Sequence, residues 1–360
     1  MRHAVLTALL LLTLVISGCG DDDPSSPAQP RTLRVPLQFA TIQEAVDEAR
    51  TGELVLVAAG TYADSVRIEL RPGFEMFVTV NLKSGVEIRG DSGQTDDVVI
   101  LGNPDQPVIF CMEVDSTTKL SNLTITGGRS GVMGWHADIV INNCVIRDVV
   151  NGAHYGAGAG LYFDFGSPTL NNCVITGNQA NSGGGAVFAN ECRPTLTNCV
   201  FMGNTAFTTS NEPGKGGALM LGNDTVGVLP NCLFSANHAD SLGGAVEIHD
   251  STLEMVNCNF THNSTDGLGG AFYLNYGGEV TLTNGLVENN QAVQFGGGFY
   301  FMGRTALTAS YSRILGNTAP QGPDGFIRQP YEPAVVTLTC CEADTTQWSG
   351  SITLDDEGCD

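Results

Sequence analysis

The chain has 360 residues, of which 45 are glycine and two are tryptophan, and its formal net charge at pH 7 is −22. A charge of this sign argues against nucleic acid as a partner, because nucleic-acid binding requires a basic surface. It also disfavours simple electrostatic attraction to acidic polysaccharides, unless cations or a local basic patch intervene. The many glycines favour a fold with numerous tight turns.

The N-terminus carries a processing signal. Arg2 and His3 precede an apolar run at 4–16, which is too short to span a bilayer as a mature helix. The run ends in Ile16-Ser17-Gly18-Cys19, which resembles the lipobox of bacterial lipoproteins. The resemblance implies a lipoprotein signal peptide at 1–19 and a lipidated Cys19. An ordinary cleaved signal peptide is the alternative.

Residues 20–33 are expected to form a disordered tether. From Gly20 to Thr32 the chain has three Asp, three Pro and no large apolar residue, so this segment cannot bury a core. A lipid on Cys19 would then hold the folded part at a membrane. Position 20 is Gly rather than the Asp that resembles an inner-membrane retention signal, so we expect the cell envelope, with the outer membrane or cell surface favoured.

Residues 34–110 are expected to form an N-terminal cap and the first coils of the fold. The segment Thr41–Ala49 predicts an amphipathic helix, with Thr41 as N-cap and Glu44 completing a capping box. Strand-like segments and a Gly-Thr-Tyr turn follow it, at 54–58, 60–62, 66–68 and 86–90. This order resembles the opening of pectin methylesterase-like and pectate lyase-like β-helices, in which a helix closes the first coil. Such closure protects core residues and strand edges.

Residues 111–325 repeat one short phrase, in which an apolar residue stands two places before an Asn. The phrase recurs at intervals of about 21 to 33 residues, a period typical of solenoids. In the copy at 195–204, Leu196 predicts a strand, Asn198 a sharp corner and Asn204 a second corner. The eight marker residues are Asn122, Asn143, Asn172, Asn198, Asn231, Asn257, Asn284 and Ser312.

A glycine pair and a third strand complete each repeat, as in Gly243-Gly244-Ala245-Val246. Three strands and three corners in about 27 residues predict one coil of an all-β, right-handed parallel β-helix. The phrases at Phe234–Asn237 and Gly243–Val246 resemble the FxxN and GGA[ILV] repeats of the polymorphic outer-membrane proteins of chlamydiae. The resemblance covers about 158–317 and implies a surface-exposed β-helix. Those proteins are anchored by a membrane barrel, which the lipid on Cys19 would replace.

The cysteines predict structural roles. One per coil is expected to face the interior as a buried thiol, with an inter-coil disulfide as the alternative, at Cys144, Cys173, Cys199, Cys232 and Cys258. Their spacing and the absence of His on the same face predict neither a metal nor a cofactor. The stacked Asn residues are expected to hydrogen-bond along the axis. Residues 326–360 are expected to form a C-terminal cap with one disulfide, whose pairing among Cys340, Cys341 and Cys359 stays open.

The third strand of each coil carries the candidate binding residues. Apolar residues alternate with others that must point out of the coil, and we expect this outer face to meet solvent. One outward row is Tyr162, Phe188, Met220, Glu247, Tyr273 and Tyr300, and its neighbour is Asp164, Asn190, Gly222, His249, Asn275 and Met302. Aromatic rings beside amides and carboxylates suit sugar rings and their hydroxyls. The candidate ligand-binding residues are therefore Tyr162, Asp164, Phe188, Asn190, Tyr273, Asn275 and Tyr300. Plain packing of aromatics on a sheet is the alternative.

Glu247, His249 and Asp250 are the catalytic candidates, and Asp164, Asn190 and Glu191 are expected as their neighbours. Paired carboxylates could hydrolyse glycosides, whereas an eliminase would need calcium-binding acids and a basic proton acceptor. Only Lys215 and Arg304 offer a basic group near this row.

The leading hypothesis is a lipid-anchored cell-surface protein for adhesion or carbohydrate binding along the third-strand face, with a polysaccharide or a surface protein as partner. A polysaccharide-active enzyme, either a lyase or a glycoside hydrolase, is the second hypothesis, although the sequence leans against catalysis. A purely structural envelope protein is the third. The segments 153–160 and 205–215 could supply a cover or one wall of a groove.

Overall fold

The computed structural model describes residues 30–152, 156–210, 212–328, 334–355 and 359. The chain divides into the units 1–30 and 31–360, and the fold below is that of the second unit. The predicted signal peptide, Cys19 and residues 20–29 of the predicted tether lie outside the described residues. Thr32 and Leu33, at the end of the predicted tether, belong instead to strand β1 (Thr32–Val35). Within the described part of the chain, no helix has the length and hydropathy needed to span a membrane.

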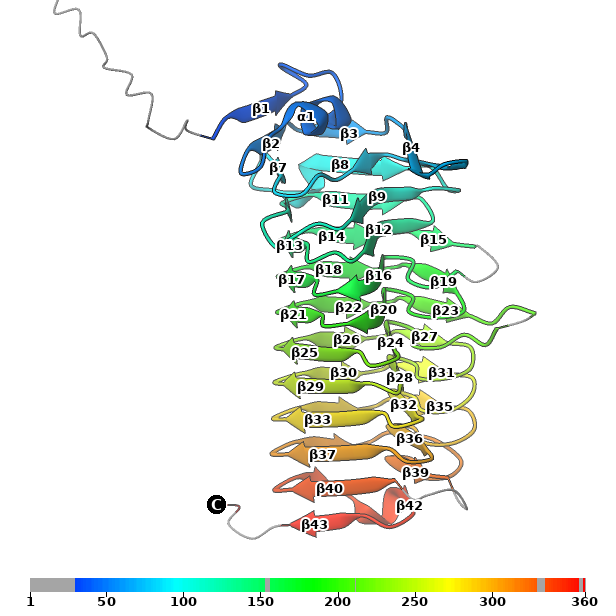
Figure 1. Cartoon of the computed structure of the whole chain (residues 1–360). Coiled ribbons are helices and arrows are strands. Elements are labelled where there is room, and N and C mark those ends of the chain that lie inside the picture. The colour runs from blue at the N-terminus through cyan, green and yellow to red at the C-terminus, as the bar shows by residue number, and fades with distance from the viewer. Residues whose placement is uncertain (1–29, 153–155, 211, 329–333, 356–358, 360) are drawn as a thin grey trace, which may run out of the picture. The chain divides into compact units, whose positions relative to one another are not determined.

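Parallel strands stack into sheets in chain order, which confirms the predicted parallel β-helix (Figure 1). The first sheet contains β1 Thr32–Val35, β2 Leu54–Val57, β7 Glu87–Gly90, β10 Lys119–Ser121, β13 Val140–Asn142, β17 Thr169–Asn171, β21 Thr195–Thr197, β25 Val226–Pro230, β29 Thr252–Val256, β33 Glu279–Thr283, β37 Ala306–Ser310, β40 Val335–Thr339 and β43 Thr353–Asp355. The second sheet contains β3 Gly60–Tyr62, β8 Val98–Gly102, β11 Thr124–Gly127, β14 Val145–Arg147, β18 Val174–Thr176, β22 Val200–Met202, β26 Leu233–Ser235, β30 Asn259–Thr261, β34 Leu286–Glu288, β38 Arg313–Leu315 and β41 Glu342–Ala343.

The third sheet carries the predicted third strands. It contains β6 Val80–Asn81, β9 Pro107–Met112, β12 Ser130–Trp135, β16 Leu161–Gly166, β20 Val187–Cys192, β24 Leu219–Gly222, β28 Val246–His249, β32 Phe272–Asn275, β36 Phe299–Met302, β39 Gly325–Ile327 and β42 Trp348–Ser349. Several coils have a fourth strand, which the expectation of three strands per coil did not include. These strands form a short sheet between the second sheet and the third sheet, and Figure 1 shows it as a separate row. The short sheet contains β15 Val150–Asn151, β19 Gln179–Asn181, β23 Thr205–Phe207, β27 His238–Ala239, β31 Ser264–Thr265 and β35 Gln291–Ala292. Its strands of two or three residues are too short to show an apolar alternation.

The N-terminal helix α1 spans Ile42–Glu48 and has the predicted capping box. Thr41 Oγ accepts from the Glu44 N–H at 3.1 Å, and the Glu44 carboxylate accepts from the Thr41 N–H at 3.2 Å. Ile42, Ala45 and Val46 are buried in the hydrophobic core. That this helix closes the end of the solenoid stays a prediction. Two 3₁₀ turns lie farther along the chain, η1 Thr95–Asp97 and η2 Thr345–Gln347.

Strands β4 Val66–Arg71 and β5 Phe74–Val78 form an antiparallel hairpin that the sequence patterns did not predict. The hairpin does not join the stacked sheets, and β5 lies beside β9 of the third sheet. It therefore stands as an added element next to the face that carries the candidate residues.

Ladders of identical side chains fill the interior of the coils. Phe201, Phe234 and Phe260 stack with ring centroids 4.5 and 4.6 Å apart. The five predicted ladder cysteines are buried thiols outside any disulfide. Burial raises the pKa of Cys144 to about 12, so this thiol stays protonated at neutral pH.

The coil pattern continues beyond the repeated phrase, because β40 to β43 extend the first three sheets past residue 325.

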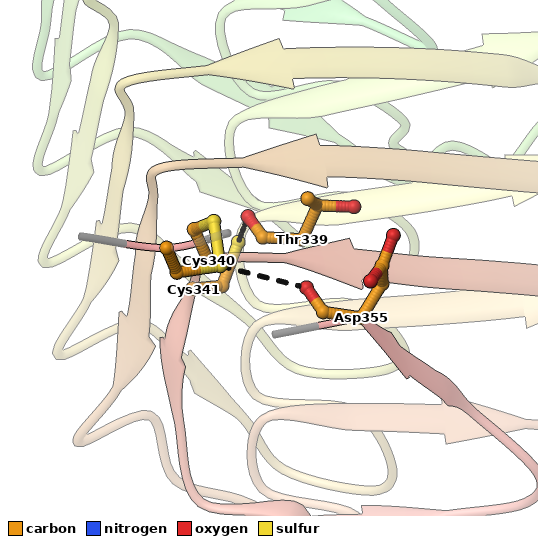
Figure 2. The surroundings of a disulfide bond; sticks show 5 residues. Thr339, Cys340, Cys341 and Asp355 are labelled. Carbon is orange, nitrogen blue, oxygen red and sulfur yellow. Dashed lines mark hydrogen bonds between the residues drawn. A yellow bond between two sulfur atoms is a disulfide. The ribbon is translucent and has the colours of Figure 1, made fainter. Parts of the chain in front are cut away.

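Cys340 and Cys359 form the disulfide, and Cys341 lies outside it (Figure 2). The Cys340 N–H donates to the Asp355 carbonyl at 3.1 Å, and Cys341 Sγ donates to the Thr339 carbonyl at 3.3 Å. The disulfide thus joins the end of β40 to the chain after β43.

Candidate functional site

The outward row of the third sheet has the predicted register. Tyr162 pairs with Phe188 on the neighbouring strand, and farther along Glu247 pairs with Tyr273, which pairs with Tyr300. The Tyr162 and Phe188 rings stack at 5.2 Å, and those of Tyr273 and Tyr300 at 5.4 Å. The sequence therefore placed these side chains on one face correctly.

The expectation that this whole face meets solvent is wrong in its C-terminal half. Tyr273 and Tyr300 are 4% and 3% exposed, Glu247 is 1% exposed, and Asn275 is also buried. In the N-terminal half, Tyr162, Asp164, Phe188 and Asn190 are half-buried and accessible.

The cover is supplied by the chain just before each glycine pair. There, residues of successive coils pair in a line of single bridges, at Gly183, Lys215, Leu242, Leu268, Phe295 and Gln321. A Cβ at Gly183 would collide with Met220 Sδ, and the Phe295 ring lies 4.7 Å from that of Phe326. The sharp turn at each first glycine, with φ near +61° at Gly243, folds this line over the third strand.

Glu247 is buried beneath that cover. Burial raises the pKa of its carboxyl group to about 7, against the opposing effects of Lys215 and Asn275. Among the described residues, neither Glu247 Oε2 nor Asn275 Oδ1 has a hydrogen-bond partner. Glu247 lines none of the pockets described below.

The other two catalytic candidates, His249 and Asp250, line a shallow pocket of about 820 Å³ with Tyr276, Gly277 and Arg304. We call it the corner pocket. The His249 and Tyr276 rings lie 5.1 Å apart, and Tyr276 is 65% exposed at a backbone φ of +46°. The structure thus keeps His249 and Asp250 together and adds Tyr276, which the sequence did not single out.

A more enclosed opening lies where the unpredicted hairpin meets the third sheet. This hairpin pocket has a volume of about 270 Å³ and contains aromatic side chains from three strands, namely Phe74 of β5, Trp135 of β12 and Tyr162 of β16. Its other lining residues are Leu70, Met76, Arg129, Met133, Asn151, Gly156 and Ala157. Burial raises the pKa of Tyr162 to about 12, so its hydroxyl remains a donor at neutral pH.

Arg129 connects the hairpin pocket to a second opening of about 440 Å³, the acidic pocket. The acidic pocket is lined by Pro104, Asp105, Gly127, Gly128, Arg129, Asp148, Val150 and Gly152. Arg129 Nε and Trp135 Nε1 are buried, and neither has a hydrogen-bond partner within the described ranges. Both side chains line the hairpin pocket, although these two nitrogen atoms are themselves covered by protein atoms.

A polar row continues from the hairpin pocket along the third sheet. Asn190 Nδ2 donates to Asp164 Oδ1 at 2.9 Å, and Asn223 Nδ2 donates to Asn190 Oδ1 at 2.8 Å. Asp164 and Asn190 therefore hold each other in place beside Tyr162 and Phe188. Their predicted role in ligand binding stays a prediction.

The sequence patterns missed Arg129, Trp135 and Phe74. Met133 and Trp135 pair with Tyr162 and Asp164, so they extend both outward rows by one coil. The signal was weak because strand β12 has the sequence SGVMGW and lacks the glycine-pair phrase. Phe74 enters the pocket only through tertiary packing.

Residues 109–319 match the family described as "Right handed beta helix region", and the chain therefore belongs to this family. This also gives the hand of the solenoid as right-handed. No curated protein matches the chain.

Solved structures with a similar fold include two from polysaccharide enzymes. The A-module of the mannuronan C-5 epimerase AlgE6 of Azotobacter vinelandii is 14% identical, with a TM-score of 0.51 over 88% of this chain and 91% of that one. The alginate lyase of Paenibacillus sp. FPU-7 is 13% identical, with a TM-score of 0.47 over 90% of this chain and 99% of that one. At 14% identity, the likeness to the epimerase module establishes the fold alone.

Proposed function

We propose that this protein binds polysaccharide, with the hairpin pocket as the main site. The observation that carries the proposal is one opening lined by three aromatic side chains, Phe74, Trp135 and Tyr162, together with the cationic side chain of Arg129. Aromatic rings stack on the apolar faces of sugar rings, and N–H donors bind their hydroxyl or carboxylate oxygens.

The N-terminal part of the outward row would continue the binding surface. Phe188 and Asn190 lie one strand beyond Tyr162 and Asp164, at the interstrand spacing of about 4.8 Å. A sugar chain running along the solenoid axis would therefore meet aromatic and amide groups in successive coils. The epimerase named above is a mannuronan epimerase, which supports including mannuronan among the first ligands tested. Arg129 would supply a local positive charge despite the overall charge of −22.

A glycan array that includes mannuronan, probed with the full-length chain, tests the proposal. We expect binding that falls about tenfold or more in a Trp135→Ala/Tyr162→Ala double variant, since stacking residues dominate such sites. Tyr311→Ala is the matched control, because this exposed tyrosine lies outside all three pockets. Equal binding by the double variant and the control would contradict the location of the site. No binding by the wild type would favour a structural role in the envelope.

The second candidate function is catalysis on a bound polysaccharide, as a lyase or a glycoside hydrolase. It is favoured by the corner pocket, where His249 and Asp250 lie beside Arg304 and could exchange protons with a substrate. Incubation of each bound glycan with the wild type, followed by chromatography of the products, tests it. Turnover that His249→Ala abolishes without weakening binding would support catalysis, and the absence of new products would exclude it for the glycans tested.

We further propose that a lipid on Cys19 anchors the protein in the cell envelope, with the outer membrane or cell surface as its location. The support is the Ile16-Ser17-Gly18-Cys19 sequence at the end of a short apolar run. Such an anchor would present the solenoid to external polysaccharides or to surface proteins, consistent with a role in adhesion.

A further inference from the structure

Three metal-ligating side chains meet on the short sheet, and none of them lines the pockets described above. His238 lies on β27, Asp240 follows two residues later on the same side, and Asp266 comes from the next coil. Since Ala239 pairs with Thr265, Asp240 and Asp266 occupy equivalent positions in adjacent coils. One nitrogen of His238 and one oxygen of each carboxylate lie within 4.8 Å of one another.

Neighbouring groups orient two of these three ligands. His238 Nδ1 lies 3.0 Å from Ser264 Oγ, and His238 Nε2 faces Asp240 Oδ1 at 3.4 Å. If Nδ1 donates to the serine oxygen, Nε2 carries the lone pair that a metal needs. Asp240 Oδ2 accepts from the Thr208 N–H at 2.8 Å, which leaves Oδ1 for a ligand.

The two carboxylates need a positive partner. Like charges on directly opposed strand positions destabilise a sheet. Among the residues that the structure describes, neither Asp240 nor Asp266 pairs with a Lys or Arg. His238 faces Asp240, and a cation between the three groups would also neutralise Asp266.

We propose that His238, Asp240 and Asp266 bind one Zn²⁺ ion. Ligand atoms on a tetrahedral zinc ion lie about 3.3 Å apart, which the separation of 3.4 Å between His238 and Asp240 matches. Asp266 is exposed, so a side-chain rotation can close the remaining gap. One nitrogen and two carboxylate ligands favour zinc over calcium or magnesium, which prefer all-oxygen sites, and leave a fourth position for water.

The bound ion would link two successive coils. It would also fix Asp240, which accepts a hydrogen bond from the Thr208 N–H. The Thr208 hydroxyl in turn lies 2.8 Å from Ser241 Oγ and accepts from the Gly214 N–H at 3.0 Å. The cysteine spacing, on which the expectation of no metal rested, gives no sign of this cluster. His238 and the two aspartates lie 2 and 28 positions apart along the chain and meet only through the coil register.

Calorimetric titration of the EDTA-treated full-length chain with ZnCl₂, and separately with CaCl₂, tests the proposal. We expect one Zn²⁺ per chain and a rise in melting temperature on binding. His238→Ala and Asp266→Asn should each weaken zinc binding about tenfold or more, with melting temperatures of the metal-free proteins close to that of the wild type. His262→Asn is the control, because His262 is exposed and lies outside the cluster.

Zinc binding that His238→Ala leaves unchanged would place the ion elsewhere, for instance on a thiol, and would overturn the proposal. Calcium binding of equal strength that does not depend on His238 would also overturn it, as would no binding of either ion. Loss of zinc binding in both His238→Ala and Asp266→Asn, with zinc binding retained in His262→Asn, would establish the site.

Discussion

Glu247 shows how one residue can be placed correctly on a face and still lie in an unexpected environment. Its position between core residues 246 and 248 directs the side chain out of the coil, as the alternation predicts. The turn before the glycine pair then covers it, so that the carboxyl group is 1% exposed and its pKa is raised to about 7. A residue expected to contact a substrate is instead a buried acid beside Lys215 and Asn275.

This environment predicts a stability that depends on pH. The folded pKa of Glu247 is above the value of the unfolded chain, so the wild type should lose stability as pH rises from about 4.5 through about 7. Glu247→Gln removes the ionisation, so its free energy of unfolding relative to the wild type should rise by about 2.5 kcal/mol between pH 5 and pH 8. Urea unfolding of both proteins at the two pH values measures this. A difference between the proteins that is the same at both pH values would contradict the prediction.

Two asparagine ladders show how elements of successive coils are joined. In the buried ladder, the side-chain Nδ2 of one coil donates to Oδ1 of the next at 2.9 to 3.0 Å, through Asn178, Asn204, Asn237, Asn263, Asn290 and Asn317. The exposed ladder runs at the other corner, where Asn231 has a left-handed backbone φ of +59°. Both were predicted as structural features, and only the structure distinguishes their burial.

The difference in burial predicts unequal costs of substitution. Asn237 accepts from the Asn204 N–H and Nδ2 and donates to the Phe201 carbonyl and to Asn263, all within the interior. Asn237→Ala should therefore lower the free energy of unfolding by about 3 kcal/mol or more, since buried partners lose their hydrogen bonds. Asn231→Ala, in the exposed ladder, should cost about 1 kcal/mol. Denaturant unfolding compares the two, and equal costs would show that burial does not control the ladder energy.

At the scale of the whole molecule, the solenoid provides a stack of coils on which separate sites are built. The hairpin pocket lies near the N-terminal coils, the corner pocket near β28 and β32, and the proposed zinc ligands on the short sheet. None of these sites requires the repeated phrase itself, because the phrase specifies interior and corner residues. The activity of the protein is therefore expected to reside in residues that differ from coil to coil.

The proposed anchor predicts where the whole protein resides. In a bacterial host, the wild type should fractionate with membranes and incorporate radiolabelled fatty acid, because several acyl chains on one cysteine bind stably to a bilayer. Cys19→Ser should abolish the label and move the protein out of the membrane fraction. Cys341→Ser is the control for loss of a thiol elsewhere. Label that persists in the Cys19→Ser protein would contradict lipidation at this residue.

The sequence by itself determined the parallel β-helix, its period, its asparagine and cysteine ladders and the register of the outward rows. These features follow from local alternation and corner residues that recur at one interval, so neighbouring coils must align them. Only the tertiary structure decided which outward residues are accessible, because the cover over Glu247, Tyr273 and Tyr300 comes from a turn whose path the local pattern does not specify. It also decided that Phe74 and Trp135 line the same pocket, since this depends on how the hairpin packs against the third sheet.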